Sequence, residues 1–350
     1  MSDKTSKGNF FEDFSLGQKL VHATPRTLTE GDVSLYTALY GSRFAFNSSD
    51  TFAMNVGLDA APLDDFLVFH IIFGRSVSDV SLNAVANLGY ASCRFSTPVY
   101  PGDTLKATSS VIGLKKNSNN KTGIVWVHTE GTNQNDEPVL DFIRWVMVPK
   151  RDMDAPAQGF LTPELDMMAA TKELPIPSAL DLSGYDTGLS GSQYLWGDYE
   201  TGERIDHIAG FTVEEAEHQM ATRLYQNSAR VHFDAEMTKE TRFGKRLVYG
   251  GHVISIARAL SFNGLGNAFK VAAINGGTHA GPVFAGDTLY AWSEILGKDQ
   301  IPERSDLGAL RLRTVVCKNQ SAGSFPYRSG EDEYDHTVVL DLDYTVLMPT

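Results

Sequence analysis

The sequence has little cysteine, no long hydrophobic run and no excess of positive charge. Cys93 and Cys317 are its only cysteines, and their spacing fits no metal motif, which argues against a zinc site and favours a reducing compartment. No window of about 18 apolar residues exists and the first residues lack a signal-peptide core, so we expect a soluble, cytoplasmic protein. The net charge is −13 without a basic cluster, which makes nucleic acid or an anionic membrane an unexpected partner.

What the sequence does contain is an internal repeat, and 350 residues are enough for two domains. Residues 11–40 align without a gap on residues 196–225, at an offset of 185. Further matches follow at other offsets: VFHIIFGRSVSDVSLN with VYGGHVISIARALSFN at 180, PVYPGDTL with PVFAGDTL at 184, and VLDFIRWVMVP with VLDLDYTVLMP at 200. The rise from 184 to 200 predicts an insertion in the second copy, an exposed loop around NQSAGSFPYRSGEDEYD.

The repeat predicts the domain organisation. We expect an N-terminal domain over 1–149, a linker over 150–193 and a C-terminal domain over 194–350. The linker is rich in Pro and Gly, which resist helices and central strands, so it is expected to run extended along the surface.

Each copy begins with a short strand that leads into a capped helix. Thr212 and Glu215 form a T-x-x-E pattern typical of a capping box, and Thr29 with Asp32 is the weaker counterpart in the first copy.

A long apolar segment follows in each copy, at 66–85 and at 247–265, and both are too long for a strand. Each predicts a buried helix. Gly-Asp turns then start three long strands per copy, rich in Val, Ile, Thr and Trp. A helix followed by consecutive hairpin strands predicts an α+β protein with two antiparallel sheets, each wrapped around a long central helix.

This plan resembles the hot-dog fold, and the motif residues resemble its MaoC-like, hydratase-2 branch. That branch carries a D-x-N-P-x-H signature after a helix and a V-H-G-M-like stretch that opens the central helix. The counterparts here are NSARVH, ending at His232, and VYGGH over 248–252. The resemblance covers nearly the whole chain as a tandem, or double, hot dog. Within the branch it points to the mesaconyl-CoA hydratase (β-methylmalyl-CoA dehydratase) group, through ARVHFD and VYGGHVISIARALSFNGL.

The motif departs from the family pattern. Asn227 occupies the place of the family's catalytic Asp, and Ala229 the place of its Asn. In the first copy, Ser42 stands at the Asp place and Asn47 at the His place. The resemblance therefore implies one active site per chain, in the second copy, with the first copy acting as scaffold and binding wall.

Adding water to an unsaturated thioester needs a proton carrier and a donor for the enolate-like oxygen. We expect His232 to be the acid/base and the backbone N–H of Gly250, at the helix start, to be the oxyanion donor. Asn227 would orient the water, since an amide cannot take a proton, and Tyr249 would contact the substrate. His232 could instead be a histidine with only a backbone partner, and Gly250 could merely form a turn.

A carboxylate could replace the missing family Asp. Asp234, two residues after the histidine, is the local candidate catalytic residue, and Asp50 of the first copy is a cross-domain one. The alternative for Asp234 is a helix N-cap.

A branched C5 dicarboxylic acyl group carries a free carboxylate that needs a cation, preferably Arg. Arg230 or Arg43 is expected to bind it, as substrate-binding residues. Either could instead be a surface Arg paired with an acid.

The function expected from the resemblance is that of a lyase, a hydratase/dehydratase that reversibly interconverts mesaconyl-CoA plus water and β-methylmalyl-CoA. The alternatives are an acyl-CoA thioesterase on the same fold and a non-catalytic acyl-CoA-binding protein. No HExxH, Walker or GxGxxG element occurs, so we expect no metal and no cofactor other than the CoA of the substrate. The two copies are expected to pack sheet against sheet, and two chains to form a homodimer.

Overall fold

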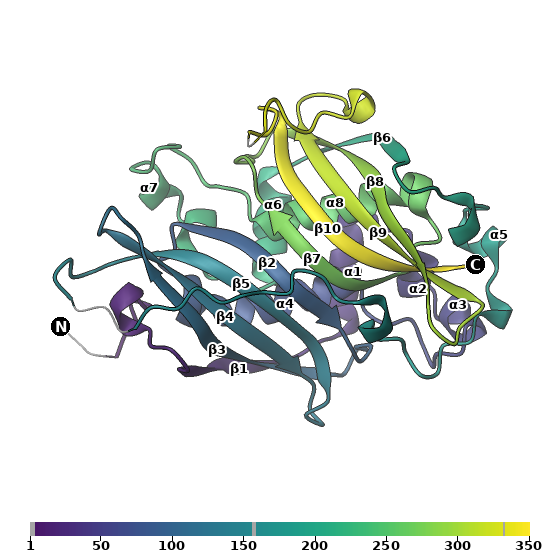
Figure 1. Cartoon of the computed structure of the whole chain (residues 1–350), viewed down its shortest axis with the longest axis horizontal. Helices are drawn as coiled ribbons and strands as arrows, with labels where there is room; N and C mark the ends of the chain where they lie inside the picture. Colours follow the sequence, from purple (N-terminus) through teal and green to yellow (C-terminus); the bar gives the residue numbers. More distant parts are fainter. Residues whose placement is uncertain (1–3, 156–158, 332) are drawn as a thin grey trace.

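Ten antiparallel strands form one continuous sheet (Figure 1). The computed structural model describes residues 4–155, 159–331 and 333–350. The strand order across the sheet is β1-β3-β4-β5-β2-β7-β10-β9-β8-β6. The strands are β1 (Lys19–Thr27), β2 (Ala86–Phe95), β3 (Thr104–Lys116), β4 (Thr122–Thr132), β5 (Pro138–Pro149), β6 (Arg204–Thr212), β7 (Lys270–Thr278), β8 (Thr288–Gln300), β9 (Leu307–Lys318) and β10 (Val338–Pro349).

The longer helices lie on one face of this sheet (Figure 1). The helices are α1 (Glu30–Tyr40), α2 (Ala45–Ser48), α3 (Asp50–Asn55), α4 (Asp65–Ser76), α5 (Thr187–Ser190), α6 (Glu215–Leu224), α7 (Ala235–Thr238) and α8 (Gly250–Leu265). The central helices α4 and α8 pack against the strands of their own halves, and most of their residues are buried. The α+β double hot-dog arrangement is confirmed. Among the described residues, no helix is long and apolar enough to span a membrane.

The two halves join edge to edge. Strand β2 pairs with β7 through Cys93 with Ile274 and Arg94 with Ala273, which makes the two five-stranded sheets one. The expected packing of sheet against sheet is therefore wrong, because the edge strands of both halves satisfy each other's backbone groups.

The two copies are related by an offset near 185 from their first strands through β4 and β9, and by 200 at their last strands, β5 and β10. Helix α4 begins at Asp65 and α8 at Gly250, and His70 Nε2 lies 3.2 Å from Ser255 Oγ where the two helices meet. The offset of 180 for these helices was wrong, because it matched side-chain letters within an apolar run instead of the helix starts. Tyr40 and Tyr225, paired at 185, share a 2.6 Å hydrogen bond between hydroxyls.

The predicted central helices are confirmed, but the first is shorter than its apolar segment. Helix α4 ends at Ser76, a π-helical turn covers Val77–Ser81, and the chain then enters β2, a strand that the apolar run concealed. Strand β7 was missed in the same way, because both strands are buried on both faces and lack clear alternation.

Only one of the two predicted capping boxes forms. Asp32 Oδ2 accepts a hydrogen bond from the Thr29 backbone N–H at 2.9 Å, as expected. Thr212 instead ends strand β6, and its hydroxyl lies 2.8 Å from Thr288 Oγ1. Helix α6 starts three residues later, so the T-x-x-E pattern there is not a cap.

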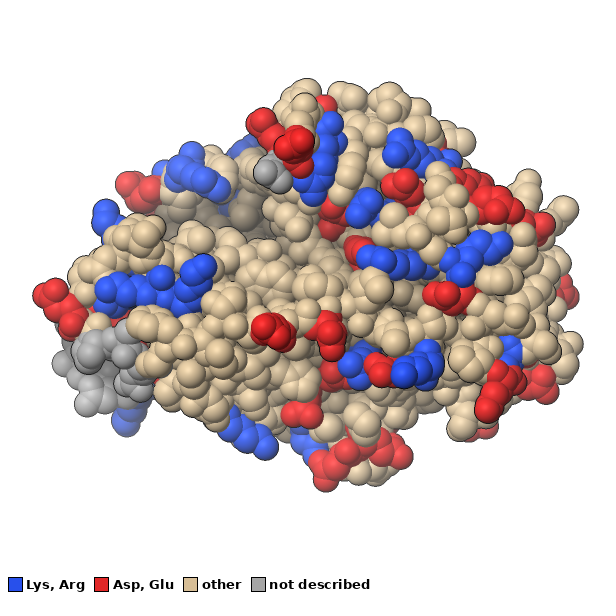
Figure 2. All heavy atoms as spheres, in the orientation of Figure 1, with Lys and Arg blue, Asp and Glu red and all other residues tan. Residues whose placement is uncertain are grey.

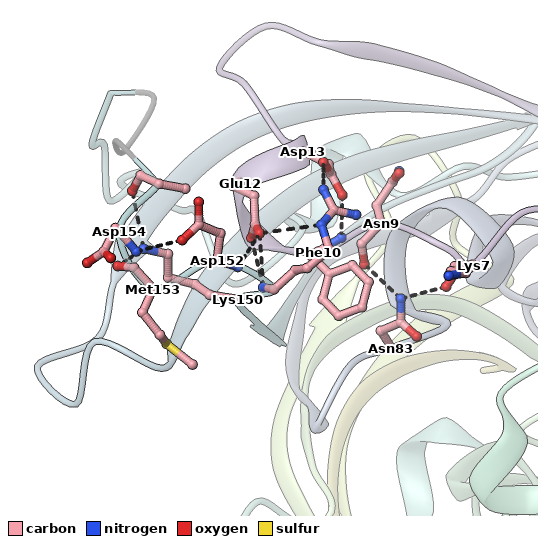
Figure 3. A network of polar contacts seen from close by, with 12 residues as sticks. Lys7, Asn9, Phe10, Glu12, Asp13, Asn83, Lys150, Asp152, Met153 and Asp154 are labelled. Carbon is pink, nitrogen blue, oxygen red and sulfur yellow. Dashed lines mark hydrogen bonds and ion pairs between the residues drawn. The ribbon is translucent and has the colours of Figure 1, made fainter.

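After the undescribed residues 156–158, the predicted linker runs along the sheet face opposite the helices, from about residue 159 to residue 172 (Figure 1). Leu161 forms a bridge with Leu114 of β3, and Thr171 Oγ1 donates to Asp299 Oδ2 of β8 at 2.9 Å. Figure 3 shows the start of this segment held to the N-terminal region, where Glu12 Oε1 accepts backbone hydrogen bonds from Arg151 and Asp152 at 2.9 and 2.8 Å.

The predicted insertion is the connection between β9 and β10, and it is only partly exposed. The Trp292 indole N–H donates to the Pro326 carbonyl at 3.0 Å, and the ring centroids of Trp292 and Phe325 lie 5.4 Å apart. The loop therefore covers part of β8.

Candidate active site

The predicted motif residues gather where three segments of the second half meet. These segments are the turn after α6, the 3-10 turn η6 (Arg230–His232), and the start of α8. The residue that follows the end of β7, His279, also reaches this place. Figure 2 shows a recess in the surface near the end of β7, beside the segment that carries α7. Around it, basic and acidic side chains are interspersed.

The His232 imidazole is held in one orientation by the main chain. Its Nδ1 lies 2.8 Å from the Leu247 carbonyl oxygen, which can only accept, so Nδ1 carries the proton of the neutral ring. Nε2 then presents a lone pair, and it makes no hydrogen bond with any described residue. Burial lowers the pKa of His232 to about 4. The ring is therefore a neutral base at pH 7 with its free nitrogen defined.

Helix α8 begins next to Tyr249 with backbone N–H groups that have no partner in the helix. The backbone N–H groups of Gly250 and Gly251, in the first turn, donate to no other described residue. The first N–H groups of a helix lack partners and carry its positive end, so they suit a developing oxyanion.

Gly250 also permits a close approach by a histidine. A Cβ added at this residue would lie 2.3 Å from Cε1 of His279, closer than any side chain allows. His279 Nε2 lies 3.2 Å from the Tyr90 hydroxyl, and burial lowers the pKa of His279 to about 4, with a further contribution from His232. The site therefore contains two neutral histidines.

Asn227 is buried and braces the turn that leads to His232. Its Oδ1 accepts from the Ala229 backbone N–H at 2.9 Å. Burial raises the pKa of the Tyr249 hydroxyl well above its usual range, while a hydrogen bond from Asn227 acts in the opposite direction. The ring centroids of Tyr249 and His232 are 5.5 Å apart. Asn227, Tyr249, His232 and Gly250 are thus brought together.

The other predicted site residues lie elsewhere or at the rim. Asp234 is exposed and caps α7, where Oδ1 accepts from the Met237 N–H at 2.9 Å, which is the alternative considered from the sequence. Asp50 accepts from the Ala61 N–H at 3.0 Å. Arg230 is exposed and forms no ion pair with a described residue. Arg43 is exposed and stacks on Phe262, near the far end of α8 from Gly250.

His279 and Tyr90 were missed by the sequence reasoning. Both lie in or just after strands that the apolar pattern did not reveal. A signal was available, because His279 lies three residues before the repeated PVFAGDTL segment and aligns with Phe95 in the first copy.

The equivalent position in the first copy keeps the side-chain hydrogen bond to the main chain but lacks the imidazole and the glycine. Asn47 Nδ2 donates to the Pro62 carbonyl at 3.1 Å, and these two residues correspond to His232 and Leu247 at an offset of 185. Asp65 replaces the glycine at the helix start, and its Oδ1 lies 2.7 Å from Nζ of the buried Lys270. This internal ion pair lines the small pocket found there. We call this position the silent site.

Comparison with known proteins finds relatives over nearly the whole chain. The family model for mesaconyl-CoA hydratase matches residues 1–332. This chain belongs to the mesaconyl-CoA hydratase family. It is 61% identical to a β-methylmalyl-CoA dehydratase of Chloroflexus aurantiacus, over 100% of this chain and 99% of that protein. It is 54% identical to a mesaconyl-CoA hydratase of Cereibacter sphaeroides, over 99% of both chains.

Solved structures show the same fold as this family member. A crystal structure of a MaoC domain protein dehydratase from Chloroflexus aurantiacus superposes with a TM-score of 0.97 at 61% identity, over 99% of both chains. A Mycobacterium tuberculosis protein described as a double hot-dog fold superposes with a TM-score of 0.77 at 28% identity, over 97% of this chain and 98% of that chain.

In this mesaconyl-CoA hydratase family member, Gly250→Ala is expected to lower kcat by roughly 10²- to 10³-fold, the loss typical of a removed oxyanion donor. The new Cβ would collide with the His279 ring and displace the helix start. Steady-state kinetics measure the effect.

The matched control is Gly286→Ala, in a turn where an added Cβ meets nothing within 4 Å. That variant is strained by its positive φ, so its stability should fall while kcat is preserved. Equal kcat for Gly250→Ala and wild type would remove Gly250 from the reaction.

Proposed function

We infer that this protein is a hydro-lyase that reversibly adds water to mesaconyl-CoA and forms β-methylmalyl-CoA. The observation that carries the proposal is the neutral His232 imidazole, with Nε2 unprotonated. Its ring lies 5.5 Å from that of Tyr249, the residue before the free N–H groups at the start of α8. The relatives that bear these two names support the choice of substrate.

The proposed chemistry needs one base and one oxyanion donor. Nε2 of His232 takes a proton from water as the water oxygen bonds to Cβ of the unsaturated thioester. The electron pair of the double bond moves onto the thioester oxygen, where the Gly250 N–H stabilises it. The imidazolium then returns the proton to Cα, so the histidine ends as it began. Dehydration follows the same steps in reverse.

Asn227 is assigned a positioning role in this scheme. Its amide holds the turn before His232 and contacts the Tyr249 hydroxyl, so it is placed to fix both the base and the water. The proton transfer itself is left to His232, because an amide cannot accept a proton near neutral pH. Asp234 is not part of the proposal, since its carboxylate is committed to the α7 cap.

The same proposal includes one active site per chain, with residues 1–149 as scaffold and binding wall. It is supported by the loss of the base to Asn47 and of the glycine to Asp65 at the silent site. We propose that no cofactor is needed beyond the CoA of the substrate, because proton transfer and oxyanion binding suffice. A homodimer in the cytoplasm is the expected form of the protein.

Incubation of the purified protein with mesaconyl-CoA tests the function. Loss of the conjugated-thioester absorbance, a product heavier by one water and no free thiol are the expected results. Release of free CoA would identify a thioesterase and contradict the proposal. Binding without any change in the thioester would contradict it as well, in favour of an acyl-CoA-binding protein.

A further inference from the structure

We propose that Arg144 of β5 binds the free carboxylate of the acyl group and thereby selects dicarboxylic thioesters. This proposal rests on the proposed function and names the residue that sets its substrate class. It moves the carboxylate-binding role from Arg230 and Arg43, which are both exposed, to a cation inside the protein.

Arg144 is fully buried and has no carboxylate partner among the described residues. Its Nη2 donates to Ser76 Oγ at 2.8 Å and its Nη1 to Ser81 Oγ at 3.2 Å, both neutral hydroxyls. Its Nε has no partner in the described part of the chain. The guanidinium lies 4.1 Å from the centroid of the Phe73 ring. A buried charge without a counter-ion is expensive, so its retention points to an anion supplied from outside.

Burial has a measurable effect on this guanidinium. It lowers the pKa of Arg144 to about 10, so the side chain stays charged at neutral pH. The groups that interact with it electrostatically are the hydroxyls of Tyr90 and Tyr249 and the ring of His22, which pairs with Asp79 at 2.7 Å. A negative charge placed here would therefore meet a guanidinium that forms no ion pair with a described carboxylate.

A continuous wall of side chains connects Arg144 to the active site. The Phe73 ring beneath the guanidinium lies 5.9 Å from the Tyr249 ring and 6.3 Å from the Tyr90 ring, centroid to centroid. Tyr249 leads to His232, and Tyr90 leads to His279 through its hydroxyl. Arg144 and His232 therefore border the same aromatic cluster. The free carboxylate of the substrate is separated from its thioester by only a short acyl chain, so the two groups of one substrate would need binding partners this near to each other.

The silent site supplies the contrast. Its buried cations are Lys270, paired with Asp65 at 2.7 Å, and Arg258, which interacts electrostatically with Asp64 and Asp65. Lys270 is therefore ion-paired within the chain, and Arg258 has two carboxylates of the chain near enough to act on it electrostatically. On the active side, Arg144 lacks any such partner, and the residue equivalent to Asp65 is Gly250. At the silent site, carboxylates of the chain therefore face the buried cations. At the active site, the carboxylate of the substrate would take that place beside Arg144.

The carboxylate also lies on the carbon that water attacks in the proposed reaction. A negative charge next to that carbon opposes the approach of a nucleophile, and a bidentate guanidinium would offset it. The exposed Arg230 cannot do this as well, because water competes for an exposed ion pair.

The test compares a dicarboxylic and a monocarboxylic substrate. Arg144→Gln is expected to lower kcat/KM for mesaconyl-CoA by roughly 10²- to 10³-fold, as for other buried charge pairs that lose one partner, while crotonyl-CoA is affected far less. Arg144→Lys keeps the positive charge but loses the planar guanidinium that can bind a carboxylate through two N–H groups. Its ratio of kcat/KM for mesaconyl-CoA to kcat/KM for crotonyl-CoA should therefore lie between the ratios of wild type and Arg144→Gln. Equal losses on both substrates would overturn the proposal.

Arg258→Gln is the matched control, because Arg258 is a buried guanidinium of α8 that faces Asp64 and Asp65 at the silent site. It should lower stability, and any loss of activity should be equal for mesaconyl-CoA and crotonyl-CoA. A change in their ratio as large as that of Arg144→Gln would contradict the assignment to Arg144.

A binding measurement separates this proposal from the proposed function. Succinyl-CoA and butyryl-CoA have no double bond, so neither can be hydrated. Calorimetry should show that wild type prefers succinyl-CoA and that Arg144→Gln loses this preference, whether or not mesaconyl-CoA is turned over. The same preference in both proteins would refute the role of Arg144 and leave the hydratase proposal standing.

Discussion

Replacing His232 with Asn is expected to lower kcat/KM for mesaconyl-CoA hydration by roughly 10²- to 10⁴-fold, the range that a positioned acid/base group contributes. The substitution copies the silent site, where Asn47 makes the same side-chain hydrogen bond to the main chain. The fold should therefore survive, because Asn at this place already exists in the first half. Steady-state kinetics with mesaconyl-CoA measure the loss, and circular dichroism checks the fold.

Asn47 provides the matched control. Asn47→Ala should leave kcat/KM for hydration unchanged, because the silent site takes no part in the reaction. Combining His232→Asn with Asn47→His should not restore activity, since Asp65 occupies the helix start and Phe95 stands where the active half has His279. If His232→Asn kept wild-type kcat/KM, His232 would not be the base.

Acidification is expected to destabilise the folded protein strongly. Burial lowers the pKa of five histidines from the usual 6.5 to about 3 or 4: His70, His207, His232, His252 and His279. Above pH 6.5 these side chains are neutral in both the folded and the unfolded state. As the pH falls below 6.5, these histidines bind protons in the unfolded chain but not in the folded protein. The free energy of unfolding therefore decreases down to about pH 4.

The expected loss is on the order of 5 kcal/mol between pH 7 and pH 5.5, since each such proton is worth about 1.4 kcal/mol per pH unit. Urea unfolding followed by circular dichroism measures it as a shift of the midpoint to lower urea. The control is the interval from pH 7.5 to 8.5, where these histidines should contribute no change. A midpoint at pH 5.5 equal to that at pH 7 would show that these rings are not held neutral.

The repeat made much of the site predictable. Aligning the copies placed Asn47 opposite His232, and the structure shows both residues donating to equivalent carbonyls. The helix over 247–265 was predicted because its apolar run is long, and it starts at the glycine that the motif singled out. These features depend on local pattern, which a sequence records directly.

Features that depend on contact between distant segments were not predictable in the same way. Arg144 was assigned only to a strand, although it alternates in phase with Phe142 and Val146, which are both buried. An arginine in a buried phase is a signal that could have found it. That Arg144 lies on the same aromatic wall as Tyr249 follows only from how the two halves pack.

The edge-to-edge join of the sheets was missed for the same reason. Strands β2 and β7 are buried and lack clear alternation, so nothing in their own pattern shows that they pair with each other. Their pairing satisfies the backbone at the edges of both halves, a constraint that acts only in the folded chain.

The central claim is that His232 is a neutral base whose proton resides on Nδ1. Nitrogen NMR of protein labelled at histidine, with His232 assigned by comparison with His232→Asn, measures the tautomer and its titration directly. The account predicts an Nδ1–H signal for His232 that does not titrate between pH 5.5 and pH 8. A signal that titrates near pH 6.5, or that shows the proton on Nε2, would contradict it.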